Sequence, residues 1–531
     1  MDPASVALAV VSVIDLCYKY GNKLAVLCHQ YRNLDADLGD TILTIQASWM
    51  KMDVQLKSLR AICDKLDYPL LNLYHDALAR LEAKLARAAE SFQVVQAKAG
   101  VAFNVHQKLK AVYLKRELAQ TVNDLEEWQR RFDPSWYLIT RIANPDVDRR
   151  LQNVRPGQQQ QQRDASISPS PSTRLARMRE SIKQLSSQGE EVSGSIFKDV
   201  TALSSEMVRI EGTNAYITRY RNSTRSVLLD PANMLSQNQI PSTTAKLNIR
   251  DLARLLLHID PLTFYLLRCD GVVELPTTHG KQFHLLLEIP VGLSSPKTLR
   301  QLLLQRPIRK CSLSHRIQLS KQLARSVMFV HAAGFVHKNI NPATVLVFHD
   351  EKNNVALGPS FLIGFERIRR AEGRTDKFGD LDWEKNLYRH PLRQGLHPED
   401  IFEMRHDIYS LGVCLLEIAL WESFVRLEGG EGGRRTSVPW SGLEILDSLA
   451  DRDQRRGAFA TKDRLLEICK EDLPSIVGEK YTSVVVSCLC CLDESDNNPF
   501  RDEKSLQDRD GIVIGVRYIE NVLLKLEELV I

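Results

Sequence analysis

The sequence lacks a strong excess of charge of either sign and an ordered set of cysteines. Lysine and arginine number 70 against 66 acidic residues in a chain of 531, which gives a net charge of +4. That excess is too small to indicate a nucleic-acid partner. The ten cysteines are scattered, apart from Cys488, Cys490 and Cys491. Their spacing fits neither a disulfide framework nor a zinc site, and it favours a cytoplasmic protein.

Near its start the sequence also lacks an apolar run of the roughly 20 residues that cross a bilayer. The almost wholly apolar stretch from Ala4 to Ile14 is shorter, and Asp2 precedes it where a secretory signal has basic residues. We therefore expect neither a membrane span nor a signal peptide here. The simpler expectation is a helix buried in a bundle, and the alternative is a segment that leaves the bundle for a membrane.

Residues 1–150 show a helical pattern throughout. Apolar residues step by three and four along Leu38–Leu66, along Tyr74–Val95 and along Leu118–Phe132, and Pro134 is expected to end the last of these helices. Each stripe must be covered by another element. Several such helices with few strand signals between them predict an all-α helical bundle as the first of at least two domains.

Residues 151–194 differ sharply in composition. The glutamine run Gln158–Gln162 is followed by Ser-Pro steps at Ser168 and Ser170. A segment of this kind cannot bury enough apolar area to offset its ordering entropy, so we expect a disordered linker, with the two serines as candidate phosphorylation sites. Beyond it, Leu175–Leu185 is typical of a short amphipathic helix, which we expect to brace a neighbouring domain.

Residues 195–531 form the second predicted domain, in which strand and helix signals are mixed. Ser226–Leu229 and Gln282–Ile289 have the composition of strands, and Ile249–Leu257 has that of a helix. Most of the remaining sequence is helical in pattern. This mixture predicts an α+β domain.

Three separated motifs in this second domain resemble those of protein kinases. HAAGFVHKNINPATVL, from His331 to Leu346, is similar to the kinase segment HxxGxxHRDxKPxNxL, and FLIGFE, Phe361–Glu366, falls where the DFG strand and turn belong. DIYSLGV looks like the kinase helix whose buried Asp braces the catalytic loop. The resemblance implies a bilobal protein-kinase-like fold, with scaffold roles for His337, Phe365 and Asp407.

The catalytic positions of that resemblance are altered. Asn339 replaces the Asp that accepts the hydroxyl proton, and its amide has no basic oxygen that titrates near neutrality. Thr344 and Gly364 replace the two metal-binding residues, and a glycine has no side chain to coordinate magnesium. We therefore expect no catalytic residues and no bound metal.

The amino-terminal part of this domain lacks the nucleotide-binding residues as well. There is no lysine between Asp199 and Ala245, no GxGxxG loop around Gly212, and no glutamate in Ile249–Leu257. A kinase uses such a lysine, loop and glutamate to hold the phosphates. No cofactor is expected, and ATP binding is kept only as an alternative.

The first 20 residues, MDPASVALAVVSVIDLCYKY, resemble the opening of the fungal HeLo domain of prion-inhibition and propagation proteins. That family implies a helical bundle whose first helix can be released into a membrane. Joined to a degenerate kinase-like domain, the arrangement is similar to that of the mixed lineage kinase domain-like proteins. The membrane-active candidates are the apolar residues Val6, Leu8, Val10, Val11, Val13 and Ile14.

The leading hypothesis is a pseudokinase that controls a HeLo-like effector in fungal cell death or heterokaryon incompatibility. An upstream kinase or protein partner would act on it, and the bundle would form a homo-oligomer on the plasma membrane. Two alternatives remain open. One is a scaffold or adaptor that never meets a bilayer, and the other is an active atypical kinase that uses Glu366 and Asp350 in place of the missing carboxylates.

Overall fold

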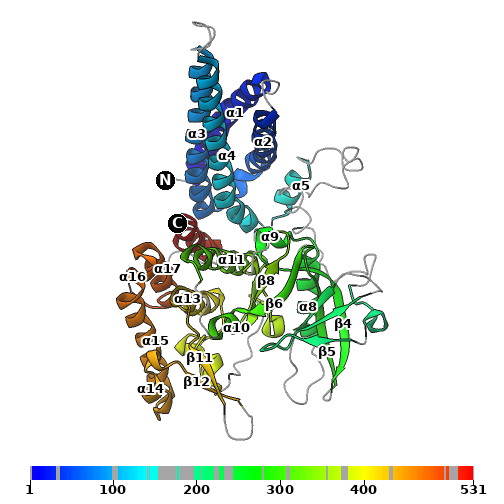
Figure 1. Cartoon of the computed structure of the whole chain (residues 1–531), viewed down its shortest axis with the longest axis vertical. Coiled ribbons are helices and arrows are strands. Elements are labelled where there is room, and N and C mark those ends of the chain that lie inside the picture. Colours follow the sequence, from blue (N-terminus) through cyan, green and yellow to red (C-terminus); the bar gives the residue numbers. More distant parts are fainter. Residues whose placement is uncertain are drawn as a thin grey trace. The chain divides into compact units, whose positions relative to one another are not determined.

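The computed structural model divides the chain into two compact units, Met1–Glu180 and Ser181–Ile531, and each is described by itself (Figure 1). The residues that the structure describes are 3–31, 36–97, 106–139, 142, 144–153, 175, 179, 196–204, 206–220, 226–232, 243–277, 280–305, 311–353, 357–371, 379, 381–429, 435–495, 498–501 and 512–529. Ser168 and Ser170 lie outside these residues.

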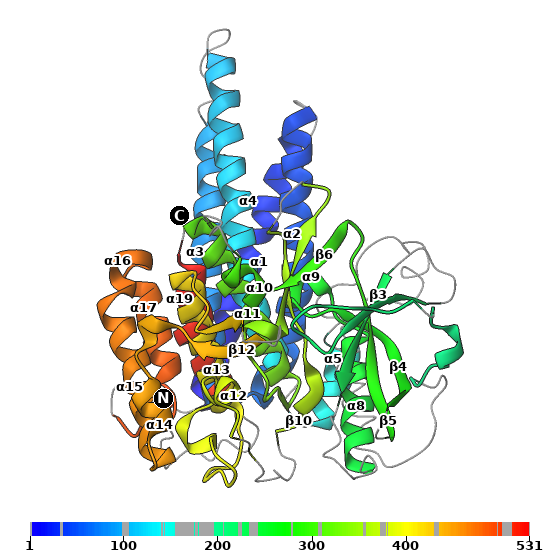
Figure 2. The same cartoon turned by 60° about the horizontal axis from the view of Figure 1, so that its bottom comes forward.

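The first unit is a bundle of long helices, as predicted. Its helices are α1 (Pro3–Tyr31), α2 (Ala36–Ile62), α3 (Tyr68–Ala97), α4 (His106–Leu138) and the short α5 (Pro145–Asn153). The helix α1 packs on α2 and α3, and α4 packs on the same two helices, so the four run alongside one another (Figure 2). The predicted stripe of α2 faces inward, and its buried members include Ile42, Ile45, Trp49, Met52, Leu56 and Leu59.

The predicted end of α4 at Pro134 is wrong, because the helix continues through this residue to Leu138. Phe132 and Trp136 flank the proline, are 1% and 0% exposed, and pack 6.2 Å apart. A proline inside a helix costs about 3 kcal/mol. Burying two large aromatic side chains contributes roughly 1.5–3 kcal/mol each, which offsets that cost.

The length argument against a membrane span is also wrong. The apolar start does not end at Ile14, because the helix α1 is 29 residues long. Within the part of the chain that the structure describes, Pro3–His29 is long and apolar enough to cross a membrane, with a mean hydropathy of 1.4 over a window that is 28% buried. The core helix of a soluble protein can pass the same test.

The second unit begins with a lobe built on an antiparallel sheet. Its strand order is β1-β2-β3-β5-β4. The strands are β1 (Val208–Arg209), β2 (Tyr216–Arg219), β3 (Ser226–Ala232), β4 (Arg268–Thr277) and β5 (Gly280–Glu288). The helix α8 (Thr243–Leu256) packs on β4, and α9 (Pro261–Phe264) follows it. Val227 and Leu229 of β3, Val273 of β4 and Leu286 of β5 belong to the core of this lobe.

The second lobe is mainly helical. Its longer helices are α11 (Leu313–Ala332), α13 (Met404–Leu420), α15 (Gln454–Glu471) and α17 (Glu479–Leu489), and its shorter ones are α10 (Leu299–Leu304), α12 (Trp383–Asn386), α14 (Leu446–Ala450), α16 (Leu473–Val477), α18 (Ile512–Tyr518) and α19 (Leu524–Glu527). Three small sheets join β6 (Leu293–Thr298), β8 (Val345–Asp350) and β9 (Ser360–Leu362), then β7 (Phe335–Val336) and β10 (Arg369–Arg370), then β11 (Val425–Gly429) and β12 (Arg435–Pro439).

The order of these elements positions the candidate site. A five-stranded antiparallel lobe with one long helix precedes a helical lobe, and the loop between β7 and β8 carries the HKN motif. The turn after β9 carries Gly364 and Phe365. This is an α+β bilobal kinase-like fold following a helical bundle, so the predicted fold class is confirmed.

Candidate functional site

The HKN loop is held by one buried carboxylate from α13. Asp407 accepts hydrogen bonds from the backbone N–H groups of His337 at 2.7 Å and Lys338 at 2.9 Å. Burial raises the pKa of Asp407, but the hydrogen bond and charge of His331 together with the contacts of His337 outweigh burial, so the net pKa lies below the usual value. Lys338 has a φ of 66°, a left-handed conformation that is costly for a non-glycine residue. The contacts of Asp407 stabilise this strained backbone.

The side chains at two of the catalytic positions are used within the loop itself. The amide of Asn339 donates to the carbonyl oxygen of Gly364 at 3.3 Å. The Thr344 hydroxyl lies 2.9 Å from the carbonyl oxygens of Asn339 and Asn341 and accepts from the N–H of Asn341 at 3.1 Å. Both groups therefore stabilise the loop conformation. His337 is fully buried beside Phe365, with ring centroids 5.0 Å apart, and burial lowers its pKa to about 4.

Gly364 occupies a position that no other residue fits easily. Its φ is +85°, and a Cβ atom built there would lie 2.5 Å from Cγ2 of Thr344. A left-handed backbone costs an L-residue roughly 1–2 kcal/mol, and the close contact adds to it. Gly364 and Thr344 therefore fit each other, because Thr344 occupies the space that a Cβ atom at position 364 would need. An aspartate at position 364 would require the HKN loop and the turn after β9 to move apart.

The turn at Gly364 is bound by a carboxylate from the first lobe. Asp230 of β3 is 1% exposed and accepts from the N–H groups of Gly364 at 2.9 Å and Phe365 at 3.1 Å. Successive N–H groups beside a left-handed residue form a concave anion site. Burial raises the pKa of Asp230 to about 7, although the two N–H groups oppose this rise. An internal carboxylate thus fills an anion site at this turn.

The turn between β1 and β2 also contacts the second lobe. Asn214 donates from its amide to Oε1 of Glu366 at 2.9 Å, and Gln301 of α10 donates to Glu211 at 3.1 Å. In a kinase the corresponding loop covers the nucleotide phosphates. In this chain the turn between β1 and β2 is joined by side-chain hydrogen bonds to Glu366 and to Gln301 of α10.

A third tie joins the helix α8 to the second lobe. Asp251 of α8 is buried, and it forms ion pairs with Arg370 of β10 at 2.5 Å and with its neighbour Arg250 at 3.1 Å. The helix α8 is thereby bonded to the segment that follows the Gly364 turn. The ties from Asp230, Asn214 and Asp251, taken together, close the two lobes on each other.

The residues present do not fit a magnesium nucleotide. Gly364 offers no ligand, and Asn339 and Thr344 make the loop contacts described above. Asp230 would place a carboxyl group in the region of a kinase's cationic lysine, where it supplies no positive charge and where its ionised form would repel a phosphate. Among the described residues no group of three or more histidine, cysteine, aspartate or glutamate side chains could hold a metal ion.

The structure does not bring Glu366 and Asp350 together into one set of contacts. Glu366 binds Asn214. Asp350 lies at the end of β8, where it accepts from the backbone N–H groups of Lys352 at 3.0 Å and Asn353 at 3.2 Å. The side-chain amide of Asn353 also donates to Asp350 at 2.8 Å, and this bond, followed by the backbone bonds, lowers the pKa of Asp350, which stabilises a turn.

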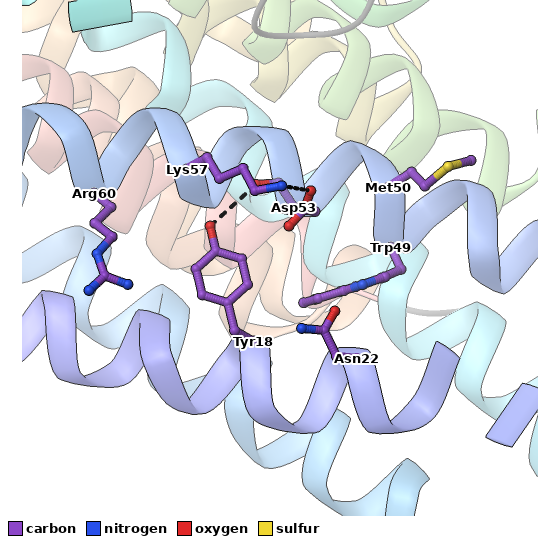
Figure 3. A pocket seen from close by; sticks show the side chains of 7 residues that line it. All are labelled: Tyr18, Asn22, Trp49, Met50, Asp53, Lys57 and Arg60. Carbon is purple, nitrogen blue, oxygen red and sulfur yellow. Dashed lines mark hydrogen bonds and ion pairs between the residues drawn. The ribbon is translucent and has the colours of Figure 1, made fainter. Parts of the chain in front are cut away.

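The helical unit has a groove of about 520 Å³ between α1 and α2. Figure 3 shows Tyr18 and Asn22 from α1 facing Trp49 and Asp53 from α2. Its cations are paired, because Lys57 contacts Asp53 at 2.6 Å and Arg60 contacts Asp15 at 2.5 Å. The groove therefore presents an amphipathic surface with little net charge.

The six membrane-active candidates divide between two faces of α1. Val6, Val10 and Ile14 are 4%, 0% and 0% exposed and belong to the bundle core. Leu8 is 68% exposed, and the remaining two, Val11 and Val13, are half-buried. While the bundle is intact, only the exposed face of α1 could therefore contact a membrane.

The predicted brace contacts the helical unit. Leu175 is fully buried, and Arg179 is 6% exposed. The Arg179 guanidinium donates to Asp148 at 2.7 Å and to the carbonyl oxygens of Ile139 and Asn144. It thus binds two backbone carbonyl groups beyond the end of α4 together with one carboxylate of α5.

Sequence reasoning missed Asp230, Asn214 and Asp251. The absence of lysine from β3 was visible, but the significance of Asp230 in SVLLDPA was not, because its partners lie 134 and 135 residues away. Asp251 stands one residue after Arg250 in a helix without glutamate. The sequence signal for Asp230 is an acidic residue in a strand that is otherwise mostly apolar.

No protein-family model matches the chain, and no curated protein matches it. A chain in the solved structure of the CAK complex from Chaetomium thermophilum bound to ATP-γ-S is similar to this chain. The identity is 15%, the TM-score is 0.31, and the match covers 54% of this chain and 88% of that chain. A likeness at this level carries no argument about residues or activity, and the fold stands on the topology described above.

Proposed function

We propose that the second unit is a catalytically inactive, kinase-like regulator of the helical unit. The observation that carries this is the Asp230 carboxylate bound to the N–H groups of Gly364 and Phe365. A triphosphate needs positive charge at this place. The carboxyl group of Asp230 supplies none in either protonation state, and its Oδ2 atom already accepts from both N–H groups. The altered residues Asn339 and Thr344 support the same conclusion.

Nucleotide binding is tested by thermal unfolding of the full chain with ATP, with and without magnesium. A ligand that binds only the native state raises the melting temperature by mass action. The expected result is no rise with either addition and no transfer of label from radioactive ATP to the chain or to a protein substrate. A rise that depends on magnesium and is abolished by Glu366→Gln would support the active atypical kinase instead.

We infer further that the helical unit is a HeLo-like effector in fungal cell death or incompatibility signalling. Its bundle begins with a long apolar helix, and Leu8, Leu16 and Val26 of that helix are 68%, 40% and 61% exposed. Apolar area contributes about 25 cal/mol for each Å² removed from water. An upstream kinase or protein partner would release the unit from the cytoplasm to the plasma membrane, where it would form a homo-oligomer.

Vesicle sedimentation tests the membrane step. Residues 1–180 and the full chain are each mixed with vesicles of phosphatidylcholine and phosphatidylserine. Both proteins are tested as wild type, with Leu8→Glu, and with the matched control Leu43→Glu, which changes an exposed residue of α2. The expected result is that residues 1–180 bind, that Leu8→Glu weakens binding, and that Leu43→Glu does not. If residues 1–180 stay in the supernatant, the membrane step is refuted and a scaffold that uses the groove of Figure 3 is favoured.

A further inference from the structure

The groove between α1 and α2 has the size of a small-ligand site and carries charges of both signs. Its volume is about 520 Å³, which lies within the roughly 300–1,000 Å³ of ligand pockets. Lys57 pairs there with Asp53, and Arg60 pairs with Asp15. Because these two cations and two carboxylates balance, a ligand with charge of one sign would be repelled by one half of the set. The groove therefore favours a zwitterion.

Two aromatic side chains stand nearly at a right angle beside Asp53. The ring centroids of Tyr18 and Trp49 are 6.4 Å apart, and the ring planes meet at 83°. Trp49 is 6% exposed and packs over Gly21, so it forms a fixed floor. Tyr18 is half-buried and reaches towards Asp53 and Lys57 (Figure 3). Burial, followed by the negative charge of Asp53, raises the pKa of Tyr18. Aromatic rings beside a carboxylate attract a cation with an apolar surface, such as a quaternary ammonium.

The spacing of the charges along α2 fits a short zwitterion. Asp53 and Lys57 are one helical turn apart, which is roughly 6 Å along the axis. In phosphocholine an ethylene link of similar reach joins the quaternary ammonium to the phosphate. The side chains of Lys57 and Arg60 are 57% and 49% exposed, and surface ion pairs contribute only about 0–1 kcal/mol. A phosphate that binds the two cations therefore loses little by separating them from their carboxylates.

Exposed apolar side chains lie next to this polar part of the groove. Met50 lines the groove and is 64% exposed. Val26 is 61% exposed and stands one turn after Asn22, a lining residue of α1. Residues four apart lie on the same face of a helix. Val26 and Met50 would cover the first carbons of acyl chains, which a free headgroup lacks.

We infer that this groove binds the phosphocholine headgroup of a phospholipid. The quaternary ammonium lies over Trp49, between Tyr18 and Asp53. The phosphate accepts hydrogen bonds from Lys57 and Arg60. The inference rests on the proposed membrane step and deepens it, because it names the headgroup that α1 and α2 recognise.

Isothermal titration of the full chain with dissolved short-chain lipids tests the groove without a membrane. The first probe is dihexanoylphosphatidylcholine, kept below the concentration at which it forms micelles. Dihexanoylphosphatidylglycerol has the same chains and phosphate but no ammonium, and free phosphocholine has no chains. These three probes separate recognition of the ammonium, of the phosphate and of the acyl chains.

Three variants and one control assign binding to the groove. Asp53→Asn removes the carboxylate and keeps the shape of a partly exposed side chain. Tyr18→Leu removes one ring, whereas Tyr18→Phe keeps it. The matched control Glu127→Gln removes a carboxylate from ion pairs with Arg131 and Lys84, outside the residues that line the groove.

The wild type, Tyr18→Phe and Glu127→Gln are expected to bind dihexanoylphosphatidylcholine alike, and Asp53→Asn and Tyr18→Leu to bind it about threefold more weakly or less. The phosphatidylglycerol and free phosphocholine should both bind more weakly than the phosphatidylcholine. Equal binding of the phosphatidylglycerol overturns recognition of the ammonium, and equal binding of free phosphocholine overturns the lipid as its source.

The absence of binding to the wild type, or equal weakening in Glu127→Gln, also overturns the inference. Failure here is distinct from failure of the proposed membrane step. Residues 1–180 can sediment with vesicles through Leu8 while this groove stays empty, and dissolved lipid can enter the groove of a chain that never sediments.

Discussion

Replacing Asp230 by asparagine should change how the stability of the second unit depends on pH. Asparagine has the same shape, keeps an oxygen for the N–H groups of Gly364 and Phe365, and has no charge. Burial is the main reason that the pKa of Asp230 is raised from 3.8 to about 7, and Glu366 adds to the rise. A shift of about three units corresponds to about 4 kcal/mol, at 1.36 kcal/mol per unit.

The sign follows from proton binding. Between about pH 4 and pH 7 the native state holds a proton on Asp230 that the unfolded state has lost. The free energy of unfolding therefore falls as pH rises through this window, and the contribution of the protonated form is fully present only below it. Asp230→Asn has no carboxyl group to lose this proton. The free energy of unfolding of the variant minus that of the wild type should therefore rise by up to about 4 kcal/mol from pH 4 to pH 8.

Urea unfolding followed by pulse-labelling hydrogen exchange measures this difference, because peptides of the two units are read separately. Subtracting wild type from variant at each pH cancels other titrating groups, including Glu417, whose pKa burial raises to about 7. Asp447→Asn, at an exposed position of α14, is the matched control and should show no trend. A difference between Asp230→Asn and wild type that stays constant from pH 4 to pH 8 would refute the account of a buried, protonated carboxyl group.

Three further substitutions test local packing. Gly364→Ala should destabilise the second unit by about 2–4 kcal/mol in urea unfolding, and adding Thr344→Ser should restore part of this, because the new Cβ would lie 2.5 Å from Cγ2 of Thr344; no loss would mean that the turn adapts. Gly21→Ala should cost the helical unit about 1–3 kcal/mol, since its Cβ would lie 2.1 Å from the Trp49 ring, and an unchanged unfolding midpoint would contradict that packing. Asp407→Ala should cost about 3–5 kcal/mol in the same assay, because it removes the buried acceptor of the HKN loop, and a cost below 1 kcal/mol would show that the loop is held by other contacts.

The helices of the bundle could be predicted because their signals are local. The period of the stripe that includes Ile45 and Trp49 fixes the buried face of α2 without knowledge of its partners. The continuation of α4 through Pro134 could not be predicted in this way, because it depends on how Phe132 and Trp136 pack against other helices. Intrinsic helix propensity is a weak guide to where a helix ends when burial of side chains against other helices outweighs it.

For the candidate site, the sequence predicts only which kinase catalytic and metal-binding residues are replaced. The motif spacing located Asn339, Thr344 and Gly364, but spacing gives no information about what the altered groups contact. The tie from Asp230 to the Gly364 turn depends on two segments that meet only after the sheet and the helical lobe have formed. Register along β3 decides which side chain faces the turn, and a shift of one residue would have placed Asp230 on the other face.

Under the proposed function, no single substitution would restore catalysis, because three ties between the lobes surround the altered positions. Asp230 binds the Gly364 turn, Asn214 binds Glu366, and Asp251 binds Arg370. Each tie satisfies buried or partly buried polar groups, so removing one member would cost its partner a hydrogen bond, at about 1–3 kcal/mol where no other partner remains. Restoring a metal-binding side chain at position 364 would also have to displace Thr344. Under the proposed function, Asp230 and Gly364 therefore serve both the stability of the closed lobes and the loss of the phosphotransferase machinery.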